Sequence, residues 1–510
     1  MIPLLQRIYY QVRQEELSTE IERIEKQLAT SDAPAMVARL SDDSMRYLRS
    51  RLAARYGKEH KRPIFQHITP ELLMEYPVVL STTFSSRSNF RAETLFDYVI
   101  MDEASQVSSE TGALALMCAH NAVIVGDSMQ LPNVITDADR LRMQAIAAKH
   151  AIDPRYDCAA LSFLESVCRV FPEAPQTLLR EHYRCHPKII NFCNQRFYGG
   201  RLLIMTEDHG EPDVIMAWRT APGHHARGAF NPREIETIRR EVLPSLPCEQ
   251  TEIGIISPYN EQVNALHREL GGGVDVATVH KFQGREKEAI ILSTVDDQIT
   301  AFTDDPNLLN VAVSRAKRQF TLVTSSNEQP DSRNIADLLA YIDYNGGMIT
   351  ESAIHSVFDL LYEPYAEARR EFLKRHRRIS EFDSENLTYA LLERVLAADP
   401  ALRHLGVLCH QPLRQLIRDW ALLDDEERRY ASNGATHLDF LIYNRVSKRP
   451  VLAVETDGYQ FHKQGTRQSE RDRMKDHILD RYSLPLLRLS TTGTDEEAKI
   501  HTQVTELLQR

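Results

Sequence analysis

The feature that most constrains this chain is an apolar strand that ends in two acids, followed by a second strand that ends in Gly-Asp. The first segment reads FDYVIMDEASQ over residues 96–106, and the second reads AVIVGDSMQLP over residues 122–132. Continuous apolar runs of this length are typical of strands buried on both faces of a parallel sheet. Open α/β sheets hold their ligands at the carboxyl ends of their strands, so Asp102 and Glu103 are predicted to face a ligand.

These two acids suit the hydrolysis of a nucleotide. Asp102 can hold Mg²⁺ through a water molecule, and Glu103 can orient or deprotonate the attacking water. A strand followed by a solvated acidic turn would show the same Asp-Glu pair. The second strand, with Gly126-Asp127 at its end and Gln130 behind it, favours the hydrolytic interpretation.

Further blocks with a fixed order carry a resemblance to a known family. They read LLREHYRCHP (178–187), IGIISPYNEQV (253–263), VATVHKFQGREKEAIILS (276–293) and NVAVSRAKRQFTLV (310–323). Together with the two acid-bearing strands, they resemble the superfamily 1 helicases of the Upf–Nam type over roughly residues 77–324. The resemblance implies RecA-like domains, binding of ATP and Mg²⁺, and action on DNA or RNA.

The resemblance also implies roles for particular side chains. Arg184 and Arg315 are similar to the family's arginine fingers, which place positive charge on the γ-phosphate during phosphoryl transfer. Gln130 is similar to the residue that senses this phosphate, Tyr183 to the residue that stacks on the base, and Glu286 to a residue near the ribose. The nucleotide-binding residues implied are Asp102, Gln130, Tyr183, Gly284 and Glu286. The nucleic-acid-binding residues implied are Thr82, Thr83, Thr278 and His280. The first two lie in VVLSTTFSS (78–86), which is predicted to be a strand that leads into a Ser/Thr turn and resembles the family's motif contacting the nucleic-acid backbone; an ordinary strand and turn is the alternative interpretation.

A helicase of this type also needs a phosphate-binding loop, G-x-x-x-x-G-K-[ST], before its Asp-Glu strand. Between Met1 and Asp102 the only Gly-Lys pair is Gly57-Lys58. Leu52 stands where the first glycine is required, and Glu59 stands where the hydroxyl is required. We therefore expect the first RecA-like domain to be truncated, with the phosphate loop encoded upstream or carried by a separate P-loop-bearing polypeptide.

The carboxyl-terminal part shows a second set of acids, on two predicted strands of a hairpin. These strands are HLDFLIYN (437–444) and PVLAVETDGYQFH (450–462), with Asp439 on the first and Glu455 and Asp457 on the second. Side chains two residues apart on a strand face the same side. Converging carboxylates form a hard oxygen site that suits Mg²⁺, and such an ion can activate water and stabilise a leaving phosphate oxygen.

This arrangement resembles the Vsr-like branch of the PD-(D/E)XK nucleases. The matching pattern is Asp439, then Glu455-Thr456-Asp457-Gly458, then His462, with Glu385 similar to the acid on that fold's first helix. The resemblance implies metal ligation by Asp439, Glu455 and Asp457, and it leaves His462 and Lys475 as alternative general bases. A hairpin with ordinary surface acids would show the same residues.

The net charge of −11 argues against a uniformly basic nucleic-acid binder, but it allows a local basic patch. The densest cluster of cations lies between residues 369 and 378, where a solvated helix face is the alternative interpretation. Seven cysteines without a C-x-x-C pair indicate neither a zinc site nor a disulfide framework. No signal peptide and no apolar run near eighteen residues is evident, so we expect a cytoplasmic protein without membrane contact.

The expected fold is α/β, with a truncated first RecA-like domain, a complete second one and a restriction-endonuclease-like domain. Strands are predicted at 253–257, 276–279, 288–293 and 319–324, and residues 205–232, with His224-His225, are predicted to form a loop. The expected parts are a helical arm (1–75), a partial RecA-like domain 1 (76–150), RecA-like domain 2 (151–348), a helical linker (349–380) and the nuclease domain (381–510).

Three functions are compatible with this organisation. The first is an ATP-dependent DNA helicase–nuclease whose phosphate loop is supplied from outside this chain. The second is a Mg²⁺-dependent nuclease whose helicase-derived part only clamps nucleic acid. The third is a non-catalytic nucleic-acid-binding protein.

The missing phosphate loop generates a first prediction. The isolated chain should hydrolyse ATP negligibly, because no loop nitrogens and no lysine hold the β- and γ-phosphates. Steady-state phosphate release measures this directly. Turnover of about 1 s⁻¹ or more, the low end of ordinary enzyme rates, that Glu103→Gln abolishes would show that the chain binds these phosphates in another way.

Overall fold

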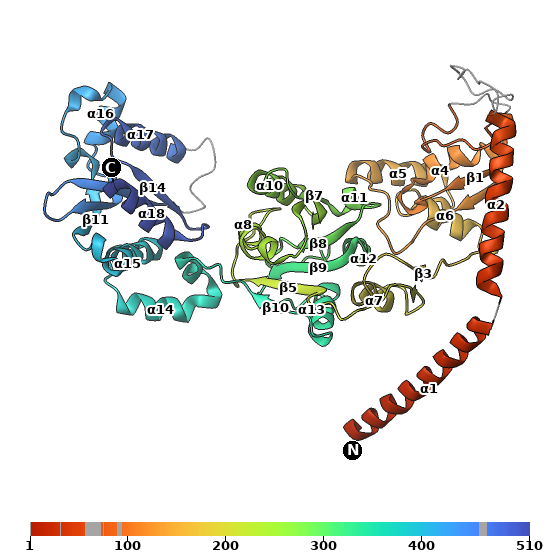
Figure 1. Ribbon diagram of the computed structural model, residues 1–510. Helices are drawn as coiled ribbons and strands as arrows, with labels where there is room; N and C mark the ends of the chain where they lie inside the picture. Colours follow the sequence, from red (N-terminus) through yellow and green to blue (C-terminus); the bar gives the residue numbers. More distant parts are fainter. Residues whose placement is uncertain are drawn as a thin grey trace. The chain divides into compact units, whose positions relative to one another are not determined.

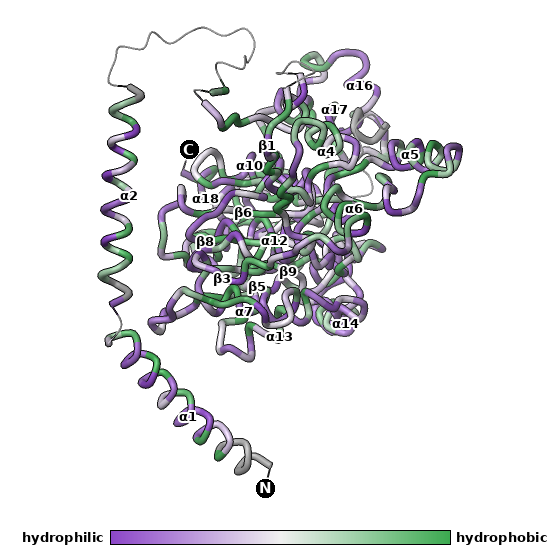
Figure 2. Tube along the Cα trace, turned by 90° about the vertical axis from the view of Figure 1, so that its right-hand side faces the viewer, coloured by the Kyte–Doolittle hydropathy of each residue, from purple (hydrophilic) through white to green (hydrophobic). Residues whose placement is uncertain are grey.

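The computed structural model describes residues 2–30, 32–56, 73–74, 76–88, 94–457 and 467–509. The chain divides into two units, Met1–Thr94 and Leu95–Arg510 (Figure 1). The first unit contains the helices α1 (Ile2–Thr30) and α2 (Ala33–Tyr56), along which hydrophobic and hydrophilic residues alternate (Figure 2). Both helices expose apolar side chains such as Ile21 and Leu48. In the described part of the chain, no helix has the length and apolarity required to span a membrane.

The predicted strand at Val78–Leu80 is not formed. Val78 and Leu80 are exposed and pair with no strand among the described residues, so the backbone lacks the neighbour that a β-ladder requires. The Ser/Thr turn that was expected after it is present. The Ser85 amide donates to the Thr82 carbonyl at 3.1 Å, and the Ser86 hydroxyl donates to the Thr83 carbonyl at 2.7 Å.

In the second unit, the two acid-bearing segments form adjacent parallel strands, β1 and β2, of a two-stranded sheet. The prediction that the first of them is buried on both faces is wrong, because Tyr98 is 62% exposed and Ile100 is 71% exposed. In the described residues β1 pairs only with β2, and a small core around Met101 and Phe163 covers one face. The elements here are β1 (Phe96–Met101), α4 (Ser109–Leu116), β2 (Ala119–Ile124), α5 (Asp137–His150) and α6 (Phe163–Val170).

A six-stranded, fully parallel sheet follows, with the strand order β10-β5-β9-β8-β6-β7. The four strands predicted from the sequence are all present. The six strands of the sheet are β5 (Ile215–Thr220), β6 (Ile253–Ser257), β7 (Asp275–Thr278), β8 (Lys287–Ser293), β9 (Ala316–Ser325) and β10 (Ile349–Glu351). The short strands β3 (Glu181–His182) and β4 (Leu203–Ile204) form a separate two-stranded parallel sheet. The helices are α7 (Pro187–Arg196), α8 (Pro232–Thr237), α9 (Leu243–Ser245), α10 (Asn260–Leu270), α11 (Val279–Phe282), α12 (Pro306–Ser314) and α13 (Asn334–Tyr344).

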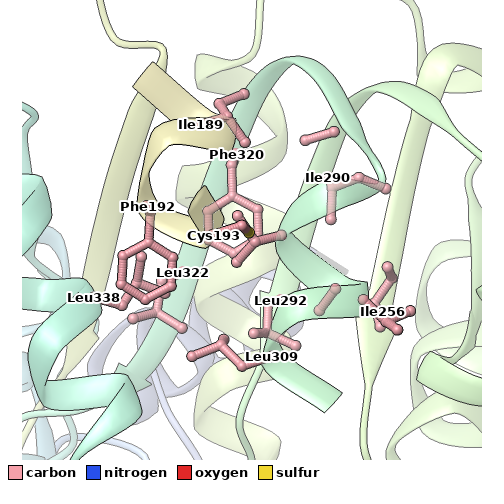
Figure 3. Packing of buried hydrophobic residues seen from close by; sticks show 14 of the residues in the cluster. Ile189, Phe192, Cys193, Ile256, Ile290, Leu292, Leu309, Phe320, Leu322 and Leu338 are labelled. Atoms are coloured by element: carbon pink, nitrogen blue, oxygen red, sulfur yellow. The ribbon is translucent and has the colours of Figure 1, made fainter. Parts of the chain in front are cut away.

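Each face of this sheet carries its own hydrophobic core. On one face, α7, α12 and α13 cover the strands, and the fully buried Phe320 lies among side chains from all three helices (Figure 3). On the other face, α8 and α10 pack against residues such as Ile255 and Ile291. Helices on both faces explain why the central strands read as continuous apolar runs.

The prediction that residues 205–232 form a loop is wrong in part. Residues Ile215–Thr220 form β5, which pairs with both β9 and β10 inside the sheet. Turn-forming Gly210, Pro212, Pro222 and Gly223 flank the strand and obscured it, although Val214–Trp218 is a short apolar run. The flanking residues remain irregular, as expected.

The carboxyl-terminal part contains a four-stranded sheet with the order β11-β12-β13-β14, in which only β13 and β14 are parallel. The expectation of a mixed α/β fold with parallel sheets is thereby confirmed. The elements are α14 (Ala366–Arg375), α15 (Asp383–Ala398), β11 (Leu405–Pro412), α16 (Asp425–Ser432), β12 (His437–Asn444), β13 (Pro450–Asp457), α17 (Arg467–Arg481), β14 (Leu486–Ser490) and α18 (Glu496–Gln509).

A short 3₁₀ helix, Val357–Leu361, joins the six-stranded and four-stranded parts. Asp359 forms a buried ion pair of 2.8 Å with Arg233 on α8, and Arg233 also donates to the Ile354 carbonyl at 2.9 Å. The neighbouring Phe358 is fully buried in the core of the four-stranded part. The segment is therefore held by both parts at once.

The core on the α7 side generates a stability prediction. Phe320→Ala should destabilise the six-stranded part by about 3–5 kcal/mol, because it removes a fully buried ring and leaves a cavity. Hydrogen exchange of peptides from β8 and β9 measures the local effect. Leu179→Ala is the control, because this side chain is 79% exposed and its removal should change hydrogen exchange little. If the β8 and β9 peptides exchange at the same rate in both variants, the assigned core is contradicted.

Candidate functional site

The predicted hydrolytic acids follow β1 directly. The Glu103 amide donates to Asp102 Oδ1 at 2.9 Å, and Gln106 Nε2 donates to Glu103 Oε2 at 3.1 Å. Glu103 has a φ of 52°, in the left-handed region that residues with a Cβ adopt at a cost. Such an outlier is a reason to suspect a functional constraint on the backbone.

The predicted arginine finger Arg184 forms an ion pair with Glu286, the predicted ribose-side acid. Arg184 Nε lies 2.5 Å from Glu286 Oε2, and Lys317 Nζ lies 2.8 Å from Glu286 Oε1. The hydrogen bond from Lys317 and the charge of Arg184 lower the pKa of Glu286. Two cations, Arg184 and Lys317, therefore pair with the carboxylate that the resemblance assigns to nucleotide binding.

Arg315, the second predicted finger, is buried at the carboxyl end of α12. Its Nε donates to the Val311 carbonyl at 3.2 Å, and its Nη2 donates to Ser314 Oγ at 3.2 Å. Burial lowers the pKa of Arg315, nearby Arg184 lowers it further, and Glu103 acts in the opposite direction. The structure thus brings both predicted fingers and the predicted catalytic acid into one electrostatic neighbourhood.

Two residues that the sequence analysis missed connect the β2 loop to the six-stranded part. Tyr198 donates to Asp127 Oδ2 at 2.5 Å, and Asn310 Nδ2 donates to Tyr198 Oη and to the Met129 carbonyl, both at 2.8 Å. Gln130 donates to Asp127 at 3.1 Å. Asn310 is the first residue of the block at 310–323 that carries the family resemblance, but its hydrogen-bond partners become apparent only in the fold.

The other predicted nucleotide and nucleic-acid residues differ in their exposure. Tyr183 is exposed and contacts Glu181, and Gly284 has a φ of 78° with open space where a side chain would project. Thr278 is buried before α11, and His280 is exposed on it. Thr82 and Thr83 belong to the first unit.

In the carboxyl-terminal part, β13 and α17 bring a carboxylate and an ammonium together away from water. Lys475 Nζ lies 2.6 Å from Glu455 Oε2 and donates to the His437 carbonyl at 3.1 Å. Glu455 is only 5% exposed, and its burial raises its pKa to about 7, although Lys475 opposes this rise. Burial alone would lower the pKa of Lys475, but the pairing with Glu455 raises it.

Asp439 lies beside Glu455 on the adjacent strand β12. Its Oδ2 accepts the Thr456 amide at 2.9 Å, and its own amide donates to Glu455 Oε1 at 3.3 Å. Burial raises the pKa of Asp439, and nearby Glu385 raises it further. The two carboxyl groups thus share a partly desolvated site at this edge of the hairpin.

Asp457, the third predicted ligand, is paired elsewhere. Arg488 on β14 lies 3.1 Å from Asp457 and 2.6 Å from Asp476. Across the residues that the structure describes, Asp439, Glu455 and Asp457 do not bring three ligand atoms within 4.8 Å of one another. Gly458 and His462 lie outside the described residues.

Two histidines near this site were missed by the sequence analysis. His410 on β11 bonds Glu385 of α15 at 2.9 Å, and the ring of His437 lies 5.4 Å from that of His410. His410 has a φ of 50°, a strained conformation inside a strand. Glu385, which was predicted, is therefore part of a carboxylate–imidazole pair beside Asp439.

The donor set of Asp439 and Glu455 fits a hard divalent cation such as Mg²⁺, because both offer carboxylate oxygens next to each other. A second cluster of potential ligands, His186, Asp208 and Glu211, fits a cation less well. His186 Nδ1 accepts the Lys188 amide at 3.1 Å, so in the neutral ring Nε2 carries the proton and faces the two acids as a donor. This histidine caps α7.

Comparison with known proteins shows helicase-type domains. Residues 6–138 and 159–327 each match a family described as an AAA domain, and residues 382–507 match a family of proteins of unknown function, DUF2726. The predicted likeness to superfamily 1 helicases is confirmed at the level of AAA domains with helicase relatives.

Three relatives illustrate the similarity. An uncharacterised ATP-dependent helicase of Methanocaldococcus jannaschii is 26% identical, over 52% of this chain and 41% of its own length. The DNA polymerase alpha-associated DNA helicase A of Saccharomyces cerevisiae is 27% identical, over 52% and 44%. The DNA replication ATP-dependent helicase/nuclease DNA2 of Gallus gallus is 28% identical, over 50% and 25%. The chain thus covers less than half the length of each relative.

The raised pKa of Glu455 generates a prediction about metal binding. Below a pH of about 7 this carboxyl holds a proton, which it must release before it can ligate a cation. The affinity of the full chain for Mn²⁺ should therefore fall as the pH drops from 8 to 6, approaching about tenfold per pH unit below the pKa.

Isothermal titration with Mn²⁺ at several pH values measures this dependence without requiring catalysis. Glu455→Gln should weaken binding and flatten its pH dependence, because the titrating carboxyl is gone. An affinity of the unaltered chain that is constant between pH 6 and 8 would contradict the assignment.

Proposed function

We propose that this chain is a nucleic-acid-processing enzyme in which a helicase-type nucleotide site is joined to a metal-dependent nuclease. The observation that carries the nuclease part is the adjacent pair of carboxyls, half-buried Asp439 and buried Glu455, with Lys475 paired to Glu455. The AAA-domain matches and the helicase relatives support the helicase part. One of these relatives is named a helicase/nuclease, which supports DNA as the substrate.

In the proposed nuclease, Asp439 and Glu455 hold Mg²⁺, which supplies an activated water and charge stabilisation when bound. Lys475 keeps its proton because its partner raises its pKa, so we assign it a role as a fixed cation and not as a general base. His410, oriented by Glu385, is positioned to accept or donate a proton at its ring nitrogen. Asp457 orients Arg488 in this proposal and joins the metal only if that ion pair opens.

In the proposed nucleotide site, Asp102 holds the Mg²⁺ of ATP and Glu103 activates water, while Arg184 and Arg315 neutralise the γ-phosphate. Gln130, Tyr183, Gly284 and Glu286 complete the nucleotide contacts. Thr82, Thr83, Thr278 and His280 contact the nucleic-acid backbone. In this role Arg184 exchanges the Glu286 carboxylate for phosphate.

The same ion pair favours a second candidate, a Mg²⁺-dependent nuclease with a non-hydrolysing clamp. With Arg184 held by Glu286, the helicase-derived part would bind nucleic acid without hydrolysing ATP. In either case we propose the nuclease domain at 381–510 and the second RecA-like domain at 151–348. We also propose the partial first RecA-like domain at 76–150, the helical arm at 1–75 and the linker at 349–380.

Removing either carboxylate tests the nuclease directly. Asp439→Ala and Glu455→Ala should each reduce Mg²⁺- or Mn²⁺-dependent cleavage of labelled oligonucleotides by about a hundredfold or more, since each removes a ligand that positions the ion. Glu455→Ala also leaves Lys475 buried without its partner, so Glu455→Gln serves as a milder second variant.

Asp425→Ala is the matched control, because this acid is 94% exposed at the start of α16 and should leave cleavage unchanged. Single-stranded, duplex and forked substrates are compared in one gel assay. No metal-dependent cleavage by the full chain, or full activity of Asp439→Ala, would refute the nuclease.

A further inference from the structure

The segment 369–378, here called the arginine segment, carries six cations and one acid in a chain of net charge −11. It comprises the carboxyl-terminal part of α14 and the three residues after it. Its cations are Arg369, Arg370, Lys374, Arg375, Arg377 and Arg378.

Some of these cations bond to other groups of the fold, and others face solvent. Arg369 donates to the Leu361 carbonyl at 2.8 Å and lies 3.5 Å from Asp383. Lys374 pairs with Glu371 on the surface at 3.0 Å. Arg377 and Arg378 are exposed, and Arg378 Nε donates to the Ser380 carbonyl at 3.2 Å.

The end of the arginine segment is fixed in place by one buried side chain. Asn386 on α15 is 1% exposed, and its Oδ1 accepts the amides of Ile379 at 2.8 Å and Ser380 at 3.1 Å. Its Nδ2 donates to the carbonyls of Ser380 and Phe382, both at 2.9 Å. The backbone after Arg378 is therefore held against the first turn of α15, where Glu385 precedes Asn386.

This anchoring places the cations near the acidic site. Glu385, which directly precedes Asn386, bonds His410 on β11 at 2.9 Å. In the antiparallel register of β11 with β12, His410 lies opposite Asp439. Burial raises the pKa of Cys409, the residue before His410, to about 11, and the charge of Arg377 acts in the opposite direction. A continuous path of neighbouring residues thus leads from the arginine segment to the proposed metal ligands.

We propose that the arginine segment binds the phosphodiester backbone of a nucleic-acid strand and guides it to Asp439 and Glu455. This inference rests on the proposed nuclease function and adds the surface that binds its substrate. Planar guanidinium groups match phosphate oxygens in a bidentate geometry, and neutralising phosphates releases counterions, which drives binding. Because Asn386 already fixes the backbone after Arg378, less conformational entropy is lost when the arginines bind phosphates.

The test compares two double variants of the full chain. Arg377→Gln with Arg378→Gln should lower the slope of log affinity against log salt by about 1.4 on single strands, at roughly 0.7 per phosphate contact. In cleavage, the KM should rise about tenfold while the kcat at saturation stays within about twofold, because the metal ligands are untouched. Binding is measured by fluorescence anisotropy of a labelled oligonucleotide in metal-free buffer.

Lys448→Gln with Arg449→Gln is the matched control. These cations are also adjacent and exposed, but they lie in the turn between β12 and β13, at the opposite end of the hairpin from Asp439 and Glu455. The control should leave the salt slope and the KM unchanged. All four positions are exposed, and matching circular dichroism and unfolding curves establish that the variants fold.

The outcomes separate this inference from the nuclease proposal. If the chain cleaves and the Arg377/Arg378 variant keeps its slope and KM, the arginine-segment proposal is overturned and the nuclease stands. If the chain binds with a slope that this variant lowers, but never cleaves, the segment binds nucleic acid and the nuclease fails. Competition by polyglutamate as strong as that by an oligonucleotide also overturns the proposal, since it indicates an acidic protein as the partner.

Discussion

The contact between Lys475 and Glu455 is the interaction on which the proposed catalytic centre depends. Both groups are buried, and removing charges from water is costly unless each has a partner of opposite charge. Lys475 provides that partner from α17, while the hairpin places Asp439 beside the same carboxylate. Because the lysine neutralises only one of two adjacent acids, the site retains excess negative potential. A divalent cation bound between the two carboxylates would compensate for such an excess.

The helicase-type part depends on a different feature, the approach of two parallel sheets. Glu103 follows the carboxyl end of β1 in the two-stranded sheet, while Arg315 ends α12 just before the amino end of β9 in the six-stranded sheet, and their charges act on each other. Asn310 and Tyr198 hold the β2 loop to the same region. In the proposed nucleotide site, Arg184 exchanges the Glu286 carboxylate for phosphate, so this ion pair is the contact expected to change first.

Much of the fold was predictable because burial leaves a direct trace in the sequence. The strands β6, β8 and β9 read as apolar runs, and β12 and β13 combine apolar residues with acids at period two. The burial of β1 could not be predicted in this way, since burial depends on which neighbours are present. The pairing of Asp457 with Arg488 depends on the parallel register of β13 with β14, which no local pattern specifies. The strained backbone of His410 likewise becomes visible only in the sheet.

Anomalous diffraction from crystals of the full chain soaked in Mn²⁺ tests the central claim most directly, because it locates the ion without relying on turnover. The account predicts a peak within about 2–2.5 Å of carboxylate oxygens of Asp439 and Glu455, the range of hard-cation contacts, which disappears in Asp439→Asn. An absence of density there at saturating Mn²⁺, or a peak confined to His186, Asp208 and Glu211, would contradict it.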